Sequence, residues 1–91
     1  MGITELYNII LDRQANPKPG SYTNSLFNDG LPRIAQKVGE EGTEVVVAAL
    51  SQENERLVEE IADLAYHVLV LMAARGITPV EVAGELEKRH K

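Results

Sequence analysis

Apolar side chains recur at the spacing of an α-helix along most of the chain. Between residues 3 and 13, Leu6 and Ile10 share one face of an expected short helix, with Thr4 as its cap. The pattern stops at residues 16–20, Asn-Pro-Lys-Pro-Gly, which predicts a loop. Residues 21–30 are rich in hydroxyl and amide side chains and have little periodicity, so we expect one helical turn there.

Two long helices are expected next. Helical spacing resumes over residues 31–50, and Pro32 falls in the first turn, where proline is well tolerated. A second long helix is expected to begin near Ser51 or Asn54 and to end at Arg75. No β-hairpin signal and no internal repeat interrupts this pattern.

A capping signal introduces the last helix. Gly76 is suited to end the preceding helix, because glycine readily adopts the left-handed backbone found there. Thr78 and Glu81 have the spacing of a capping box, with Pro79 at the first helical position. A final helix is therefore expected to run toward His90.

The second long helix is apolar over more than one face. Its apolar side chains between residues 57 and 72 cover an arc of about 200°, wider than the stripe of about 100° that a surface helix needs. Both sides of this helix must be covered. The sequence thus predicts an all-α single domain over residues 1–91, with four to five helices. Two of them are long and antiparallel, and the chain is expected to form a helical-bundle homodimer.

The charge, hydropathy and cysteine content of the chain exclude several classes of partner and metal site. Fourteen acidic residues against nine Lys and Arg give a net charge of −5, so nucleic acid is not an expected partner. The longest apolar run, residues 68–74, is far shorter than the roughly 20 residues that span a bilayer, and we expect a cytoplasmic protein without a membrane partner. Because the chain has no cysteine, a metal would have to be held by carboxylates or by the two histidines. A supply of mainly oxygen ligands fits Mg²⁺ best.

The candidate chemistry lies in two acidic motifs, one on each long helix. The first holds Lys37, Glu40, Glu41 and Glu44, and the second holds Glu60, Asp63 and His67. Glu41 falls within the apolar stripe of its helix and is predicted to point inward, where an unpaired carboxylate is costly. If the helices pack antiparallel, the carboxylates meet and repel unless a cation neutralises them. The motifs therefore predict Mg²⁺, with Mn²⁺ as a substitute, and chemistry on a polyphosphate.

Several of these residues also have plainer interpretations. Lys37 and Arg33 are candidates both for surface pairs with glutamates and for phosphate ligands at the rim of the site. The hydroxyl of Ser25 fits either a turn or a substrate contact. His67 fits a core histidine that makes hydrogen bonds, and also a residue that supports a metal ligand.

The motifs together resemble a known family. E-E-x-x-E followed by E-x-x-D is similar to the all-α NTP pyrophosphohydrolase superfamily, which includes the MazG-like enzymes. Five segments look like the phosphoribosyl-ATP pyrophosphohydrolase family of histidine biosynthesis: Gly20–Thr23, Ser25–Phe27, Lys37–Glu41, Thr43–Val46 and Ala62–Leu71. The resemblance extends from the first helix to the end of the last. Gly42 departs from it, since alanine is common there in the family.

The resemblance implies Mg²⁺-dependent hydrolysis of phosphoribosyl-ATP to phosphoribosyl-AMP and pyrophosphate, the second step of histidine biosynthesis. It implies these Mg²⁺ ligands: Glu41, Glu44, Glu60 and Asp63. It also implies that Lys37 contacts phosphate, and Arg33, Tyr22 and Ser25 are further candidates for substrate contacts. We expect Glu40 or Glu41 to accept the proton of the attacking water, because both lie on the metal-facing helix.

Two other functions stay open. One is a house-cleaning dNTP pyrophosphohydrolase of the same superfamily, and the other is a helical dimerisation module without enzymatic activity. The second leaves the inward position of Glu41 unexplained.

Overall fold

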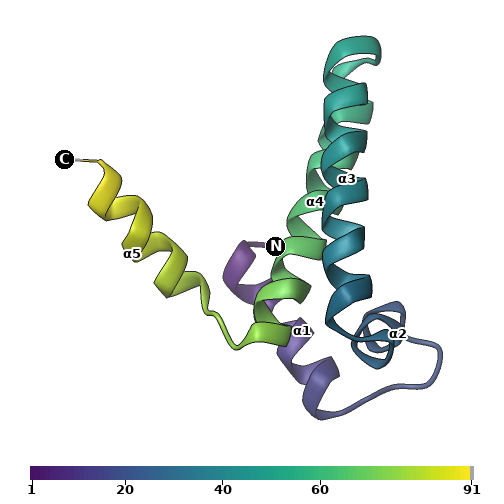
Figure 1. Ribbon diagram of the computed structural model, residues 1–91, viewed down its shortest axis with the longest axis vertical. Coiled ribbons are helices and arrows are strands. Elements are labelled where there is room, and N and C mark those ends of the chain that lie inside the picture. The colour runs from purple at the N-terminus through teal and green to yellow at the C-terminus, as the bar shows by residue number, and fades with distance from the viewer. Residues whose placement is uncertain (91) are drawn as a thin grey trace.

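The computed structural model describes residues 1–90, and all regular secondary structure in that range is α-helical. The helices are α1 (Ile3–Ala15), α2 (Tyr22–Asp29), α3 (Leu31–Ser51), α4 (Asn54–Arg75) and α5 (Pro79–Arg89) (Figure 1). The all-α expectation is confirmed, with five helices in the described part of the chain. None of them is long and apolar enough to cross a membrane.

The two long helices, α3 and α4, form an antiparallel hairpin. They contain 21 and 22 residues, and only residues 52 and 53 separate them. A connection this short forces neighbouring helices to run in opposite directions. The helices lie side by side along most of their length (Figure 1). The hairpin confirms the predicted pair of long helices and sets the acidic motif of one against that of the other.

The hydrophobic core lies at one end of this hairpin, where α1 and α2 pack against it. Ile10, Leu26, Ile34 and Val70 are almost completely buried, one from each of the first four helices. Tyr7 is also buried, and its hydroxyl donates a 2.6 Å hydrogen bond to the carbonyl of Ile77, beyond the end of α4. The core thus fixes the position of α2 relative to α3 and α4.

Helix α2 is longer than the sequence pattern indicates. The expectation of one turn is wrong, because the segment forms a helix of eight residues. The Ser21 side chain caps it by accepting a hydrogen bond from the backbone NH of Asn24. The buried Asn24 amide donates to the carbonyl of Arg13 and accepts from the NH of Lys18, so it ties α2 to α1 and the loop. Tertiary contacts of this kind leave no periodicity in a sequence.

The helix ends agree with the capping signals except in α1. Gly76 ends α4 with φ of +70°, and Thr78 and Glu81 complete the capping box of α5. The expectation that Thr4 caps α1 is wrong, because the helix begins at Ile3 and Gly2 is its cap residue. Glu5 reaches back to the NH of Gly2, which satisfies one free donor of the first turn.

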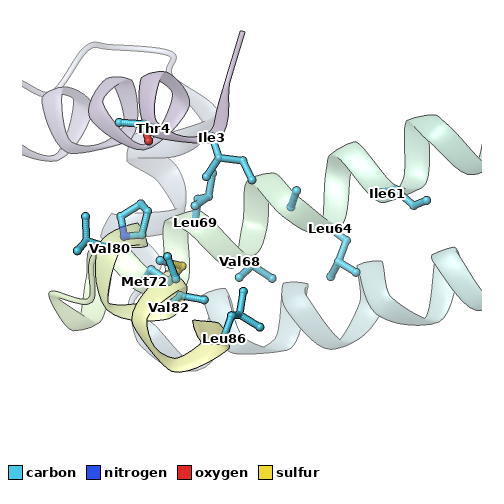
Figure 2. A pocket seen from close by; sticks show the side chains of 13 residues that line it. Ile3, Thr4, Ile61, Leu64, Val68, Leu69, Met72, Val80, Val82 and Leu86 are labelled. Atoms are coloured by element: carbon cyan, nitrogen blue, oxygen red, sulfur yellow. The ribbon is translucent and has the colours of Figure 1, made fainter. Parts of the chain in front are cut away.

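Helix α5 extends away from the rest of the chain (Figure 1). It has no buried residue, and its backbone packs only against that of α1 among the described helices. Between α1, α4 and α5 lies a groove of about 650 Å³. Apart from Thr4, the side chains that line it are apolar, including Ile61 and Val68 of α4 and Leu86 of α5 (Figure 2).

Candidate active site

Three carboxylates from the two long helices converge at the middle of the hairpin. Glu41 of α3 and Glu60 and Asp63 of α4 each place one oxygen so that all three lie within 4.8 Å of one another. The Glu60 side chain is 4% exposed and that of Glu41 is 13% exposed, whereas Asp63 lies at the surface. The inward position predicted for Glu41 is therefore confirmed, and the cluster opens to solvent at Asp63.

The donor set fits a hard divalent cation. It consists of carboxylate oxygens alone, which Mg²⁺ prefers, and its open side leaves room for water or phosphate ligands. Bonds of about 2.1 Å place the oxygens around one Mg²⁺ at most about 4.2 Å apart. Neighbouring oxygens around an octahedral ion lie only about 3 Å apart. Oxygens separated by up to 4.8 Å therefore have to move closer by rotation of their side chains when one ion binds, and Asp63, the most exposed of the three, is the freest to do so.

Two basic side chains neutralise part of this cluster. The Lys37 Nζ lies 3.2 Å from Glu41, and the Arg56 Nη2 lies 2.7 Å from the buried Glu60. The hydrogen bond to Glu41 raises the pKa of Lys37 above its ordinary value, although partial burial opposes the rise. Lys37 is thus held in its charged form beside the carboxylates.

The other predicted acids of α3 lie outside the cluster. Glu40 is exposed and pairs with Arg33 at 3.7 Å and Lys37 at 3.5 Å. Glu44 is also exposed and is not part of the three-carboxylate group. The structure therefore brings together three of the four predicted metal ligands and places Arg33 and Lys37 along the same edge of α3.

His67 connects the cluster to α2. This buried side chain has its Nδ1 2.7 Å from the carbonyl of Asp63 and its Nε2 3.0 Å from the hydroxyl of Tyr22. Because a carbonyl only accepts, Nδ1 carries the proton, and in the neutral ring Nε2 accepts the hydrogen bond from the Tyr22 hydroxyl. His67 thus links the backbone turn that carries Asp63 to the side chain of Tyr22, and its predicted role in supporting a metal ligand stays a prediction.

Ser25 serves the local structure of α2. Its hydroxyl donates a 2.6 Å hydrogen bond to the carbonyl of Tyr22, three residues earlier. Tyr22 itself is half exposed, and its ring stacks on that of Tyr66 with centroids 6.3 Å apart. Both residues are exposed, so both of these predicted substrate contacts have surface available to a ligand.

Comparison with known proteins identifies the chain's relatives. Residues 3–90 match the phosphoribosyl-ATP pyrophosphohydrolase family. The chain belongs to this family. It is 57% identical over 86 residues to the phosphoribosyl-ATP pyrophosphatase of Sulfurisphaera tokodaii, a match that covers 94% of this chain and 92% of the relative.

Two further relatives carry the same name. The phosphoribosyl-ATP pyrophosphatase of Saccharolobus solfataricus is 52% identical over 89 residues, covering 98% of this chain and 95% of the relative. That of Lacticaseibacillus casei is 55% identical over 87 residues, covering 96% of this chain and 79% of the relative. The resemblance inferred from the sequence motifs is confirmed.

Three residues at the site of this phosphoribosyl-ATP pyrophosphohydrolase family member, Thr23, Tyr66 and Arg56, were not among the predicted site residues. Thr23 and Tyr66 share a hydrogen bond between their hydroxyls, next to the bond between Tyr22 and His67, so two adjacent bonds hold the first turn of α2 on α4. Burial raises the pKa of Tyr66. Arg56 lies four residues before Glu60, and this spacing on a helix was the one available signal of their pairing.

Proposed function

We propose that this chain hydrolyses phosphoribosyl-ATP to phosphoribosyl-AMP and pyrophosphate, the second step of histidine biosynthesis. The family match and the names of near-full-length relatives support this reaction. The structural observation that carries it is the convergence of Glu41, Glu60 and Asp63 between the long helices. We place the reaction in the cytoplasm, which stays a prediction from the sequence.

Mg²⁺ is the cation we propose for the cluster, with Mn²⁺ as a substitute. Glu41, Glu60 and Asp63 would hold it, and Glu44, one turn further along α3, is proposed as an additional ligand. When bound, the cation supplies neutralising charge to the polyphosphate. The support for this proposal is the all-oxygen donor set, because three carboxylates this close repel one another without added positive charge.

The remaining steps fall to the side chains around the cluster. Glu40 or Glu41 is proposed to accept the proton of the attacking water, since both lie on the helix that faces the reacting phosphates. Lys37 and Arg33 carry positive charge along the same edge and are proposed to bind phosphate oxygens. Tyr22, half exposed beside the cluster, is proposed to contact the substrate, and Ser25 stays a weaker candidate.

Pyrophosphate release tests this function directly. Phosphoribosyl-ATP, dCTP, dUTP and ATP are offered separately to the protein, each with Mg²⁺ and with EDTA. The proposal expects release from phosphoribosyl-ATP with Mg²⁺, little release from the other nucleotides, and none in EDTA. Release chiefly from the dNTPs would assign the chain to the house-cleaning enzymes, and no release from any nucleotide would leave only the dimerisation module.

We further propose a homodimer that covers the groove between α1, α4 and α5. Groove residues such as Ile61 and Val80 are 49% and 80% exposed, and the lining contains no charged side chain. Two copies of a chain with a net charge of −5 repel, so a second copy is best accommodated by a face without acidic groups. A large apolar surface that one chain leaves uncovered is typical of an interaction site.

Sedimentation tests the dimer. The unmodified chain is expected to sediment at twice its mass of 10.0 kDa at micromolar concentration. Ile61→Asp, which adds a charge to the groove, is expected to shift the protein toward monomer, whereas Leu11→Asp, at a partly exposed position of α1 outside the groove, should not. A monomer in the unmodified chain would contradict the proposal.

A further inference from the structure

Arg56 provides the chain's own counter-charge for the buried carboxylate of the cluster. Its Nη2 lies 2.7 Å from the Glu60 Oε1, and its Nη1 lies 3.0 Å from the exposed Glu59. The Glu60 side chain is 4% exposed, so a missing partner would leave a nearly buried negative charge uncompensated. The ion pair with Glu60 is therefore the dominant contact of this guanidinium.

The charges of the site predict competition between Arg56 and a divalent cation. Glu41, Glu60 and Asp63 carry three negative charges, and Lys37 and Arg56 supply two positive ones. A divalent cation on the same carboxylates adds two positive charges beside Lys37 and Arg56. The nearby guanidinium is then repelled by the cation, while the anionic oxygens of a polyphosphate become a better partner for it.

The position of Arg56 allows such an exchange. It lies in the first turn of α4, and its side chain is 50% exposed, so the guanidinium can leave Glu60 by rotation about its side-chain bonds. Glu60 is buried and stays in place. The planar guanidinium matches two phosphate oxygens at once, a geometry that the ammonium of lysine cannot reproduce.

We propose that Arg56 is exchanged from Glu60 to the pyrophosphate portion of the substrate when the divalent cation binds the cluster. This proposal rests on the proposed function, because it needs a polyphosphate and a cation at this site. It makes Arg56 a phosphate-binding residue that also keeps Glu60 neutralised between rounds of binding.

Calorimetric titration of Mg²⁺, followed by pyrophosphate at saturating Mg²⁺, tests the exchange with Arg56→Gln. Removing a unit charge about 5 Å from a divalent ion in water tightens its binding on the order of tenfold. Arg56→Gln is therefore expected to bind Mg²⁺ several-fold more tightly and pyrophosphate about tenfold more weakly. Arg56→Lys should recover part of the pyrophosphate affinity, because lysine restores the positive charge but lacks the planar guanidinium that bonds two phosphate oxygens at once.

Arg89→Gln is the matched control, because Arg89 also pairs with a glutamate four residues away, at 3.4 Å on the exposed α5. It should leave both affinities unchanged. Thermal unfolding in EDTA measures the stability of the protein without the cation. Arg56→Gln is expected to lower the Tm by about 4 °C or more, because the buried Glu60 then has no counter-charge, and Mg²⁺ should restore the Tm.

The outcomes separate the exchange from other roles. If Arg56→Gln weakens Mg²⁺ binding, Arg56 only holds Glu60 in position, and the exchange is overturned. If Arg56→Gln changes neither the Mg²⁺ affinity nor the pyrophosphate affinity, the exchange is also overturned, and the contact between Arg56 and Glu60 is then an ion pair without a role in binding. If the unmodified protein binds neither Mg²⁺ nor pyrophosphate, the proposed function fails, and the exchange fails with it.

Discussion

Asp63→Asn separates the repulsion within the acid cluster from its attraction for a cation. The three carboxylate oxygens lie within 4.8 Å of one another. At that separation each pair repels by about 0.9 kcal/mol in water and by about 3.5 kcal/mol at an effective dielectric constant of 20. Asp63 is exposed, so the lower value applies. The substitution removes two such pairs, worth about 2 kcal/mol together at low salt, but it also removes the attraction of Asp63 to Lys37 and Arg56. The free energy of unfolding in EDTA is therefore expected to stay unchanged or to rise by less than about 2 kcal/mol.

The same change should weaken Mg²⁺ binding. Loss of a residue that only supports a metal ligand costs about 10-fold to 100-fold in affinity, so loss of a ligand charge should reach about 100-fold. At a Mg²⁺ concentration 100 times the Kd of the unmodified protein, the cation stabilises that protein by about 2.7 kcal/mol. A variant that binds 100-fold more weakly gains only about 0.4 kcal/mol at the same concentration.

Urea denaturation with EDTA and with Mg²⁺ measures both effects on the same samples. The expected pattern is a variant that is at least as stable as the unmodified protein in EDTA and much less stabilised by Mg²⁺. Asp29→Asn makes the same chemical change at an exposed position outside the cluster and should alter neither value by much. Equal stabilisation of both proteins by Mg²⁺ would refute the assignment of Asp63 as a ligand.

Three further predictions concern single contacts. Tyr7→Phe removes the donor to the Ile77 carbonyl and should lower the free energy of unfolding, measured in urea, by about 1 kcal/mol. An unchanged free energy of unfolding would contradict this contact. The raised pKa of Lys37 stabilises the fold fully below its ordinary value of 10.5, and this stabilisation is lost as the pH rises through the raised value. Urea denaturation should therefore show the unmodified protein losing its advantage over Lys37→Met above pH 10.5, and a constant difference would contradict this. Tyr22→Phe frees His67 from α2 and should lower kcat/KM for phosphoribosyl-ATP by about tenfold, whereas an unchanged kcat/KM would remove Tyr22 from the site.

Local patterns predicted most of the fold. The apolar spacing of α3 and α4, the glycine after α4 and the capping box of α5 act within a few residues, so they are visible in the sequence. Helix α2 was underestimated because its stability depends on Asn24, which bonds to Arg13 eleven residues away. Contacts over that distance leave no repeat that a periodicity can detect.

The candidate site was predicted to a similar extent. A carboxylate within an apolar stripe must find a partner, and this correctly directed Glu41 toward α4. The pairing of Thr23 with Tyr66 depends on how α2 docks, which no spacing along the chain records. Arg56 was missed because an arginine four residues before a glutamate usually marks an exposed helix pair, and only the fold shows that Glu60 is buried.

The most direct test of the central claim compares pyrophosphate release from phosphoribosyl-ATP by the unmodified chain and by Asp63→Asn, at a Mg²⁺ concentration of about one-tenth of the Kd of the former, where the rate follows the occupancy of the site. The account predicts release by the unmodified chain only when Mg²⁺ is present, and a rate for Asp63→Asn lower by about 100-fold, in line with its weakened hold on the cation. Equal rates for the two proteins, or release by the unmodified chain in EDTA, would contradict it.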